Sequence, residues 1–273
     1  MVVQHNLTAM NSNRQLGITS ALQAKSSEKL SSGFKINRAA DDAAGLTISE
    51  TMRSQVRGLN RASANAQDGI SLIQVAEGAL TETHSILQRM NELATQGAND
   101  TNTENDRKAI QSELDELVKE IDRISETTTF NTQVLLKGEF TDKAIQVGAK
   151  EGEFEKISIS IDAMSREGLE LDEENTIEDN AGGQALMTKY QTAIGKVSEQ
   201  RSKLGALQNR LEHTVLNIDN IAENTQAAES RIRDTNVPKE MVEFSKNNIL
   251  AQAGQAMLAQ ANQSTQGVLS LLR

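Results

Sequence analysis

The chain has 273 residues, with no Cys, no Trp, one Tyr, five Phe and a single Pro. Large globular cores are usually packed with aromatic side chains, and this chain has few. The composition therefore favours a long, thin helical body. The lack of cysteine excludes disulfides, thiolate chemistry and cysteine-based zinc sites. The net charge is −10 and no basic stripe carries interleaved aromatic residues, which excludes nucleic-acid binding.

The charge is spread unevenly along the chain. Residues 1–67 hold eight Lys or Arg against four Asp or Glu, whereas residues 139–180 hold thirteen acids against four bases. We therefore expect an acidic, solvated middle segment. No stretch is long and apolar enough to cross a bilayer, and residues 1–7 lack the basic start and apolar run of a cleaved signal, so we expect a soluble chain without membrane insertion.

The first thirty residues have an amphipathic pattern with a thin apolar seam. Its predicted members lie on one helix face: Val3, Leu7, Met10, Ile18, Leu22 and Leu30. The rest of the segment is filled with small and polar residues. An isolated helix with so little apolar area is marginal in water, so we expect this end to be disordered in the monomer and to fold on assembly.

Two stronger seams with alternating spacings of three and four residues follow. The first consists of Ile73, Ala76, Leu80, Thr83, Leu87, Met90 and Ala94. The second consists of Ile110, Leu114, Leu117, Ile121 and Ile124. The polar stretch 96–103 between them predicts a chain reversal, with Thr103 as the N-cap of the second helix, so the two helices should lie antiparallel.

The period changes to two between residues 134 and 161. Residues 144–148 and 157–161 alternate apolar and polar side chains and are separated by glycines and acids, which predicts a β-hairpin. Residues 162–184 should form an irregular acidic crossing. A third long seam consists of Ile194, Val197, Arg201, Leu204, Gln208, Leu211, Val215, Ile218, Ala222 and Thr225. A helix from about residue 186 to 233 would be roughly 70 Å long.

The last segment repeats the thin pattern of the first. Its predicted seam consists of Leu250, Gly254, Met257, Ala261, Ser264, Val268 and Leu271. Pro238 is placed to begin this helix in its first turn. We expect the two ends to pair, and the fold class to be mainly α, with long antiparallel coiled-coil-like helices, paired terminal helices and a small β-hairpin subdomain.

The chain lacks the residue patterns of an enzyme. Its three histidines, His5, His84 and His213, have no partner at ligand spacing, and no nucleotide-binding, zinc-protease or serine-hydrolase motif is present. Asp41 and Asp42 are adjacent, so on a helix they would point apart, and we interpret them as helix-start or turn acids. We predict no catalytic residues, no metal site and no cofactor.

Both ends of the chain strongly resemble bacterial flagellins. The N-terminal resemblance rests on residues 30–46, LSSGFKINRAADDAAGL, and on residues 65–71, NAQDGIS. The C-terminal resemblance rests on QNRLE at 208–212, SRI at 230–232, KEM at 239–241 and MLAQANQ at 257–263. Together it covers residues 1 to about 137 and 186–273. It implies a structural subunit that polymerises into the flagellar filament and serves swimming motility.

The resemblance also implies a domain division. Residues 1–40 and 234–273 would form the inner helical domain, and residues 41–137 and 186–233 the helical-bundle domain. Residues 138–185 would form the β-hairpin and acidic crossing in place of the variable outer domain. That segment contains no histidine, which excludes the metallopeptidase that some flagellins carry there.

Several partners are implied in the same way. The family is secreted to the extracellular filament as an unfolded chain by the flagellar type III apparatus, and an export chaperone binds the C-terminal segment, here about 234–273. The filament cap and hook-filament junction proteins are further expected partners.

Host Toll-like receptor 5 is the last implied partner. The resemblance implies that the residues of this chain that contact the receptor are Gln88, Arg89, Glu92, Leu93 and Glu113. Asn91 departs from the Arg that many detected members carry. Arg89 with Glu92 also fits an ordinary solvated i,i+3 pair.

Two other functions remain open from the sequence. A hook-filament junction protein shares the terminal patterns but should not form long filaments. A signalling coiled coil, such as a chemoreceptor cytoplasmic region, would have stable helical ends and no self-polymerisation, and it leaves the hairpin segment unexplained.

Overall fold

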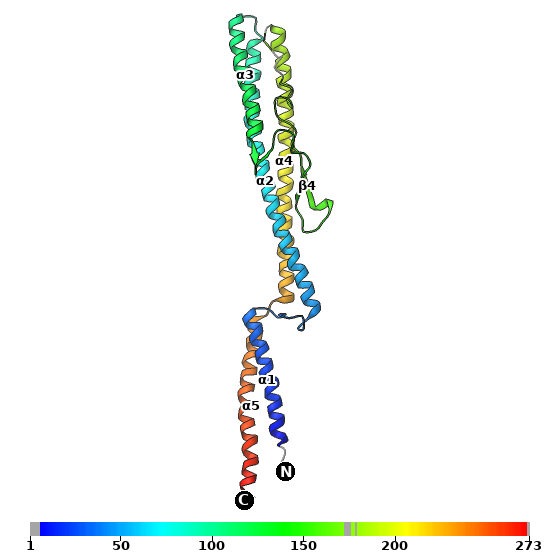
Figure 1. The fold of residues 1–273 in the computed structure, drawn as a ribbon, viewed down its shortest axis with the longest axis vertical. Coiled ribbons are helices and arrows are strands. Elements are labelled where there is room, and N and C mark those ends of the chain that lie inside the picture. Colours follow the sequence, from blue (N-terminus) through cyan, green and yellow to red (C-terminus); the bar gives the residue numbers. More distant parts are fainter. Residues whose placement is uncertain (1–5, 172–175, 178, 272–273) are drawn as a thin grey trace. The chain divides into compact units, whose positions relative to one another are not determined.

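The computed structural model describes residues 6–171, 176–177 and 179–271, with side chains described up to residue 264. Five helices dominate these residues (Figure 1): α1 Leu7–Ser32, α2 Ala43–Gly97, α3 Glu104–Thr127, α4 Asn180–Arg233 and α5 Val237–Leu271. Four short strands are β1 Thr129–Phe130, β2 Gln133–Val134, β3 Lys143–Gln146 and β4 Lys156–Ile159, with a 3-10 turn, η1, at Glu153–Glu155. The predicted mainly α fold class is confirmed.

The chain forms two compact units. The terminal unit contains residues 1–54 and 224–273, and the bundle unit contains residues 55–223. The division implied by the resemblance, after residue 40 and before residue 234, stays a prediction. The first turns of α2 and the last turns of α4 belong to the terminal unit, where they are joined by ion pairs between Arg53 and Glu229 and between Glu50 and Arg233. No helix of the described residues combines the length and apolarity that crossing a membrane requires.

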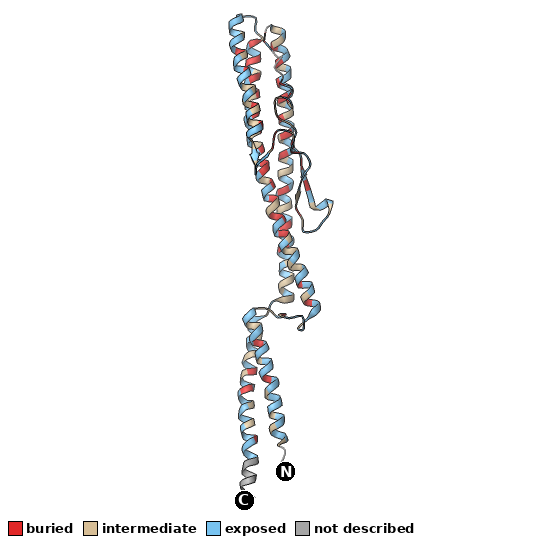
Figure 2. Ribbon diagram, viewed as in Figure 1, coloured by how far each residue is buried: buried red, intermediate tan, exposed pale blue. Residues whose placement is uncertain are grey.

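The bundle unit is built around the predicted seams of α2, α3 and α4. All seven seam residues of α2, from Ile73 to Ala94, are buried. On α3, Ile110, Leu114 and Ile121 are buried, and on α4 the seam positions Val197 and Leu204 are fully enclosed. Figure 2 shows these buried positions as a line along the facing sides of the helices. The three-four spacing therefore identified the core of this unit correctly.

The reversal between α2 and α3 has the predicted cap. The Oγ1 of Thr103 accepts the N–H of Asp106, and the Asp106 carboxylate accepts the N–H of Thr103, which is a capping box. The start of α4 packs closely against this turn, because a Cβ on Gly183 would lie 2.8 Å from the Ala98 Cβ. Helix α4 thus begins at Asn180, six residues before the predicted start, and ends at Arg233 as predicted.

The predicted β-hairpin is present. Strand β3 pairs antiparallel with β4, with Ile145 opposite Ile157. A second, smaller hairpin joins β1 and β2 and was not predicted. Its two turn residues, Asn131 and Thr132, have φ of 47° and 66°, the left-handed pair that a tight two-residue hairpin requires.

The acidic crossing is less solvated than expected. Its apolar residues Met164, Leu169, Leu171 and Ile177 are at most 4 % exposed and belong to the bundle core. The Met164 N–H donates to the Leu136 carbonyl at 2.8 Å, which anchors the segment. The expectation of a solvated segment rested on its acidic residues. It did not take account of the apolar residues between them, which are buried in the core.

In the terminal unit, α1 and α5 lie side by side (Figure 1). Asn236 caps α5 by accepting the Lys239 N–H at 3.2 Å, and Pro238 is the second helical residue, within the first turn as predicted. Both described helices cover each other along a seam, and the sequence prediction identified only Leu30, Gly254 and Ala261 of its residues.

Candidate interaction surface

The seam that joins α1 to α5 is made of small and polar residues. On α1 the buried or half-buried positions repeat every three and four residues: Ala9, Ser12, Leu16, Thr19, Gln23, Ser26 and Leu30. On α5 they are Glu240, Phe244, Asn247, Ala251, Gly254, Leu258 and Ala261. We call these two sets the inner seam. The Leu16 side chain lies over Gly254, where an added Cβ would come within 3.3 Å of its Cδ1.

Two side-chain hydrogen bonds lie at or beside the inner seam. The Thr19 hydroxyl donates to the Gln15 carbonyl at 3.0 Å, and the Asn6 side chain donates across the pair to the Ala261 carbonyl at 2.9 Å. The buried apolar area is small, so the helix pair gains little hydrophobic stabilisation by itself.

Most residues of the predicted terminal seams lie on a different face. Leu7, Met10, Ile18 and Leu22 are 48–65 % exposed, and on α5 Leu250 and Met257 are 50 % and 62 % exposed. Among the described residues of the predicted seams, Leu30 on α1 and Gly254 and Ala261 on α5 turn inward. Val3 and the side chains of Val268 and Leu271 lie outside the described residues. Both faces have the same three-four spacing, so the spacing alone does not show which face joins the two helices, and the role of the outer residues in polymerisation stays a prediction.

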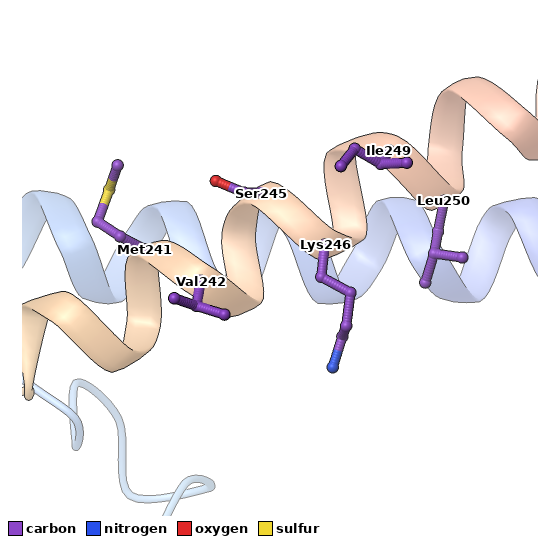
Figure 3. Close-up of a pocket in the computed structure, with 6 residues that line it drawn as sticks. All are labelled: Met241, Val242, Ser245, Lys246, Ile249 and Leu250. Carbon is purple, nitrogen blue, oxygen red and sulfur yellow. The ribbon is translucent and has the colours of Figure 1, made fainter.

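An open groove runs along the exposed side of α5 (Figure 3). It is lined by Met241, Val242, Ser245, Lys246, Ile249 and Leu250 and has a volume of about 490 Å³. Val242 and Ile249 are 67 % and 66 % exposed. Large apolar side chains gathered on one face of a helix are typical of a surface that a partner covers.

Charged residues are scarce on this pair. Before Lys25 the only charged residue is Arg14, and no residue between Asn247 and Leu271 is charged. A helix that stays in water normally carries charges on its exposed face. The parts of α1 and α5 farthest from residues 25–29 and 239–246 therefore lack the charges that would keep their exposed faces solvated.

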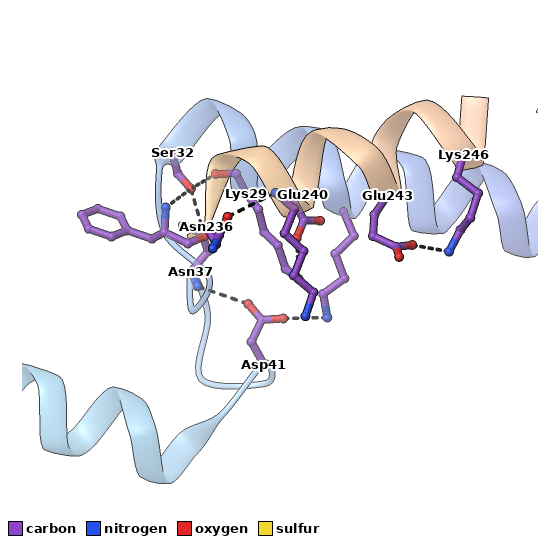
Figure 4. A network of polar contacts seen from close by, with 11 residues as sticks. Lys29, Ser32, Asn37, Asp41, Asn236, Glu240, Glu243 and Lys246 are labelled. Atoms are coloured by element: carbon purple, nitrogen blue, oxygen red, sulfur yellow. Dashed lines mark hydrogen bonds and ion pairs between the residues drawn. The ribbon is translucent and has the colours of Figure 1, made fainter. Parts of the chain in front are cut away.

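A polar network fastens α1 to the segment that follows it (Figure 4). Lys25 Nζ lies 2.8 Å from the Asp41 carboxylate, which also accepts the N–H groups of Asn37 and Arg38. The Lys25 hydrogen bond, followed by these backbone N–H groups, lowers the pKa of Asp41 to about 2. Asp42 accepts the Gly45 N–H at 2.9 Å. The two aspartates are therefore turn and helix-start acids, as predicted.

Ion pairs also join α1 to α5 and support α5 itself. Lys29 Nζ lies 3.7 Å from a Glu240 carboxylate oxygen across the pair. One turn further, Glu243 pairs with Lys246, and this hydrogen bond lowers the pKa of Glu243 (Figure 4). The charges of the helix pair are thus concentrated near the ends where α1 stops and α5 starts.

A second cluster surrounds Phe34, directly after Gly33 ends α1 in the left-handed conformation. The guanidinium carbons of Arg233 and Arg53 lie 4.8 and 5.8 Å from the Phe34 ring centroid. Arg233 pairs with Glu50 at 2.6 Å. The backbone completes the joint, because the Lys35 N–H donates to the Arg233 carbonyl and the Thr235 N–H donates to the Gly33 carbonyl. Sequence patterns gave no signal for this cluster beyond a lone aromatic residue.

The residues predicted for receptor recognition divide between surface and core. Gln88, Arg89, Glu92 and Glu113 are exposed, whereas Leu93 is 2 % exposed and packs in the bundle core. The Arg89 Nε and Nη2 donate to Glu113 Oε1 at 3.1 and 2.9 Å, and Arg89 Nη1 lies 3.5 Å from Glu92. The pKa of Arg89 is raised chiefly by Glu113. Arg89 thus connects α2 to α3 more closely than it pairs within α2.

The described residues contain no group of three or more His, Cys, Asp and Glu side chains arranged to hold a metal ion. Most of the exposed large apolar side chains of the described residues lie on α1 and α5.

Comparisons with known proteins agree at both ends of the chain. Residues 3–141 match the bacterial flagellin N-terminal helical region, and residues 187–272 match the bacterial flagellin C-terminal helical region. A flagellin of Halalkalibacterium halodurans is 55 % identical over 273 residues, and a 31.3 kDa flagellar filament core protein of Treponema maltophilum is 49 % identical over 286 residues. Both alignments cover all of each chain.

A solved structure of a protein described as flagellar hook-associated, from Vibrio parahaemolyticus, has the same fold with a TM-score of 0.59. It is 13 % identical, and the match covers 71 % of this chain and all of that one. The fold is therefore shared with hook-associated proteins, whereas the full-length identity is with flagellins. The chain belongs to the bacterial flagellin family: it is a structural subunit of the flagellar filament and not an enzyme.

Proposed function

We propose that the subunits polymerise through the outer face of the terminal helix pair. The observation that carries this proposal is the set of exposed apolar side chains on α1 and α5, two helices with no charged residue before Lys25 except Arg14 and none between Asn247 and Leu271. Covering these side chains with a second copy removes apolar area from water at about 25 cal/mol per Å². Because α1 and α5 present different residues, the contact is heterologous and extends indefinitely when its rotation does not close.

The double variant Val242→Gln and Ile249→Gln tests this proposal in the full-length chain. Both side chains are about two-thirds exposed, so the monomer should melt as the wild type does while its critical concentration for polymerisation rises at least tenfold. Gln255→Asn, an exposed polar position of the same helix, is the matched control. Filaments formed at the wild-type concentration by the double variant would contradict the proposal.

A deletion of residues 241–273 gives a coarser version of the same test. It should abolish polymerisation and leave the bundle unit helical by circular dichroism. Electron microscopy of the intact protein separates the proposal from the hook-filament junction alternative, because only a filament subunit forms long filaments alone.

We further propose that the subunit is secreted and extracellular, exported as an unfolded chain, with contacts to the filament cap and hook-filament junction proteins. An export chaperone would cover the α5 groove within residues 234–273, since an apolar helix face needs a partner before assembly. Calorimetry with the flagellar export chaperone should show binding to wild type and weaker binding to the Val242→Gln and Ile249→Gln variant. Equal affinity for both would exclude the groove as the chaperone site.

Recognition by Toll-like receptor 5 is a separate proposal for the bundle unit. The surface formed by Gln88, Arg89, Glu92 and Glu113 is exposed on α2 and α3, which supports it; Leu93 would act only by packing beneath them. Arg89→Ala should reduce signalling in receptor-expressing reporter cells. Lys119→Ala, which removes a comparable exposed cation from α3, serves as the control.

A further inference from the structure

The loop between β3 and β4 presents a fully exposed aromatic side chain. Phe154 lies in η1 and is 101 % exposed, whereas the other exposed large hydrophobic residues of the described chain are 41–67 % exposed. The chain has only five Phe and no Trp. An aromatic ring held entirely in water forgoes the stabilisation it would gain by burial, and such rings often anchor interfaces.

The loop that carries Phe154 is held in one conformation by its own hydrogen bonds. The Val147 N–H donates to the Glu155 carbonyl at 2.8 Å. The Gln146 side chain donates to the carbonyls of Gly148 and Lys150 at 3.0 and 2.9 Å. A loop fixed in this way loses little entropy when it binds.

The β3–β4 hairpin packs closely against two glycines of helix α2. A Cβ on Gly58 would lie 2.8 Å from the Ala149 Cβ, and one on Gly69 would lie 2.3 Å from the Ile145 Cδ1. Between them the Asn65 side chain donates to the Gln146 carbonyl at 3.2 Å. The spacing of eleven residues brings the two glycines to the same helix face, about three turns apart. Phe154 is therefore presented from a rigid base.

The acidic residues around Phe154 favour a partner surface that carries positive charge. Glu151, Glu153 and Glu155 surround Phe154, and none of them has an ion-pair partner among the described residues. Lys150 and Lys156 flank the group. The bundle unit also carries three exposed arginines that lack an ion-pair partner in the described part of the chain: Arg57, Arg61 and Arg210. Each copy thus carries both the acidic loop and cations that could receive it.

We infer that residues 150–155 form a contact between neighbouring copies of this chain, with Phe154 as the apolar anchor and Glu151 and Glu153 paired with exposed arginines of the second copy. The inference rests on the proposed polymerisation and adds to it a contact made by the bundle unit. Arg210 lines the same hollow as Phe154 and Glu155. A contact in which one copy supplies the loop and the next copy supplies the arginines is heterologous and can repeat from copy to copy.

Phe154→Ala in the full-length chain is the first test. The critical concentration for polymerisation should rise about tenfold, as for removal of an interface anchor, and Phe154→Leu should give a smaller rise. The melting of the monomer should not change, because the ring contacts nothing that stabilises the single chain. Polymerisation of Phe154→Ala at the wild-type concentration would overturn the inference. Failure of the wild-type chain to polymerise would instead overturn the proposed function.

A photo-reactive benzophenone amino acid at position 154 identifies the partner. Illuminated filaments should give copy-to-copy cross-links that dilute monomer does not give, and mass spectrometry should map them to α2 or α4 of the second copy. Cross-links confined to α1 and α5, or none in filaments, would contradict the contact. Cross-links only to an added foreign protein would do the same.

The charge pairing has its own measurement. Added salt screens the repulsion between copies of net charge −10 as well as the proposed ion pairs, so the critical concentrations of the wild type and of a variant without these pairs are compared at each salt concentration. The variant Glu151→Gln with Glu153→Gln should show a weaker salt dependence. An unchanged salt dependence would remove the arginine pairing from the inference.

Discussion

The bundle unit and the terminal unit use the same helical spacing for opposite purposes. In the bundle, the large residues of the spacing, such as Leu80, Leu87 and Leu114, are turned inward and are at most 1 % exposed. In the terminal unit the inner seam is filled by residues such as Thr19, Ser26 and Ala251, while Met10 and Met257 face outward. Figure 2 shows the contrast as dense burial along α2 to α4 and sparse burial along α1 and α5. The first unit buries its large apolar residues within the single chain, whereas the second leaves many of its own exposed, which is the basis of the proposed contact with other copies.

The largest expected difference between the units comes from truncating one large residue in each. Leu87→Ala leaves a cavity in the bundle core and should lower the free energy of unfolding by about 2–5 kcal/mol. Met257→Ala removes a side chain that is 62 % exposed and should change it by no more than about 0.5 kcal/mol, while raising the critical concentration for polymerisation. Chemical denaturation of the two monomeric variants measures both changes in the free energy of unfolding. Similar losses in the two variants would remove the distinction.

The Phe34 cluster should govern how firmly the terminal pair is held. Arg233→Gln removes the stacked guanidinium and its ion pair with Glu50, so we expect the pair to lose about 1–2 kcal/mol. Hydrogen exchange of the α1 and α5 amides in the monomer should then become about tenfold faster. Arg231→Gln, an exposed arginine without a partner among the described residues, is the control. Equal exchange rates in the two variants would show that the Phe34 cluster does not stabilise the α1–α5 pair.

Two glycines of α2 distinguish open from occupied surfaces within the bundle. Nothing lies within 4 Å of a Cβ added to Gly78, so Gly78→Ala should raise the free energy of unfolding by about 0.5–1 kcal/mol. Gly69→Ala should lower it, because the new Cβ would meet Ile145 of the hairpin. Thermal unfolding of the two monomers compares them directly. A gain in stability from Gly69→Ala would show that the hairpin is not seated as described.

The smallest expected effect is a pH dependence in the terminal unit. The pKa of Asp41 is about 2 in the folded chain and 3.8 without its partners. Its contribution to stability is therefore present above about pH 4 and is lost as the pH falls through about 2. Lys25→Met should move the carboxyl titration, followed by NMR, upward toward 3.8, while the backbone N–H donors keep it below that value. A titration that does not move would exclude Lys25 as the main cause.

Much of the fold follows from the sequence where large residues occupy the seams. The seams of α2, α3 and α4, the Thr103 cap and the β3–β4 pairing all appear in their predicted places. The terminal helices were harder, because each has two faces with three-four spacing. The large residues Leu7, Met10 and Leu250 give the outer face the stronger hydrophobic pattern. The small residues of the inner seam give a weaker one.

The rest depended on contacts that are distant in sequence. Phe34 meets Arg233 only once the two linkers pair, and Arg89 meets Glu113 only across the antiparallel helices. Leu93 was predicted as a receptor contact by resemblance alone, and burial of this side chain follows from the packing of α2 in the bundle. Local spacing identifies such residues but cannot say which neighbours they will have.

The pairing of α1 with α5 also sets an order of folding. The hydrogen bond from Asn6 to Ala261 joins residues 255 positions apart, and closing so long a loop in an unfolded chain is entropically costly. Once α2 and α4 have packed, the chain segments leading to both ends are already neighbours, and the remaining loop is short. The terminal helices should then zip from the Phe34 and Asp234 bridge toward Asn6, and fray in the reverse direction. The end of the pair farthest from that bridge is therefore the part that opens first.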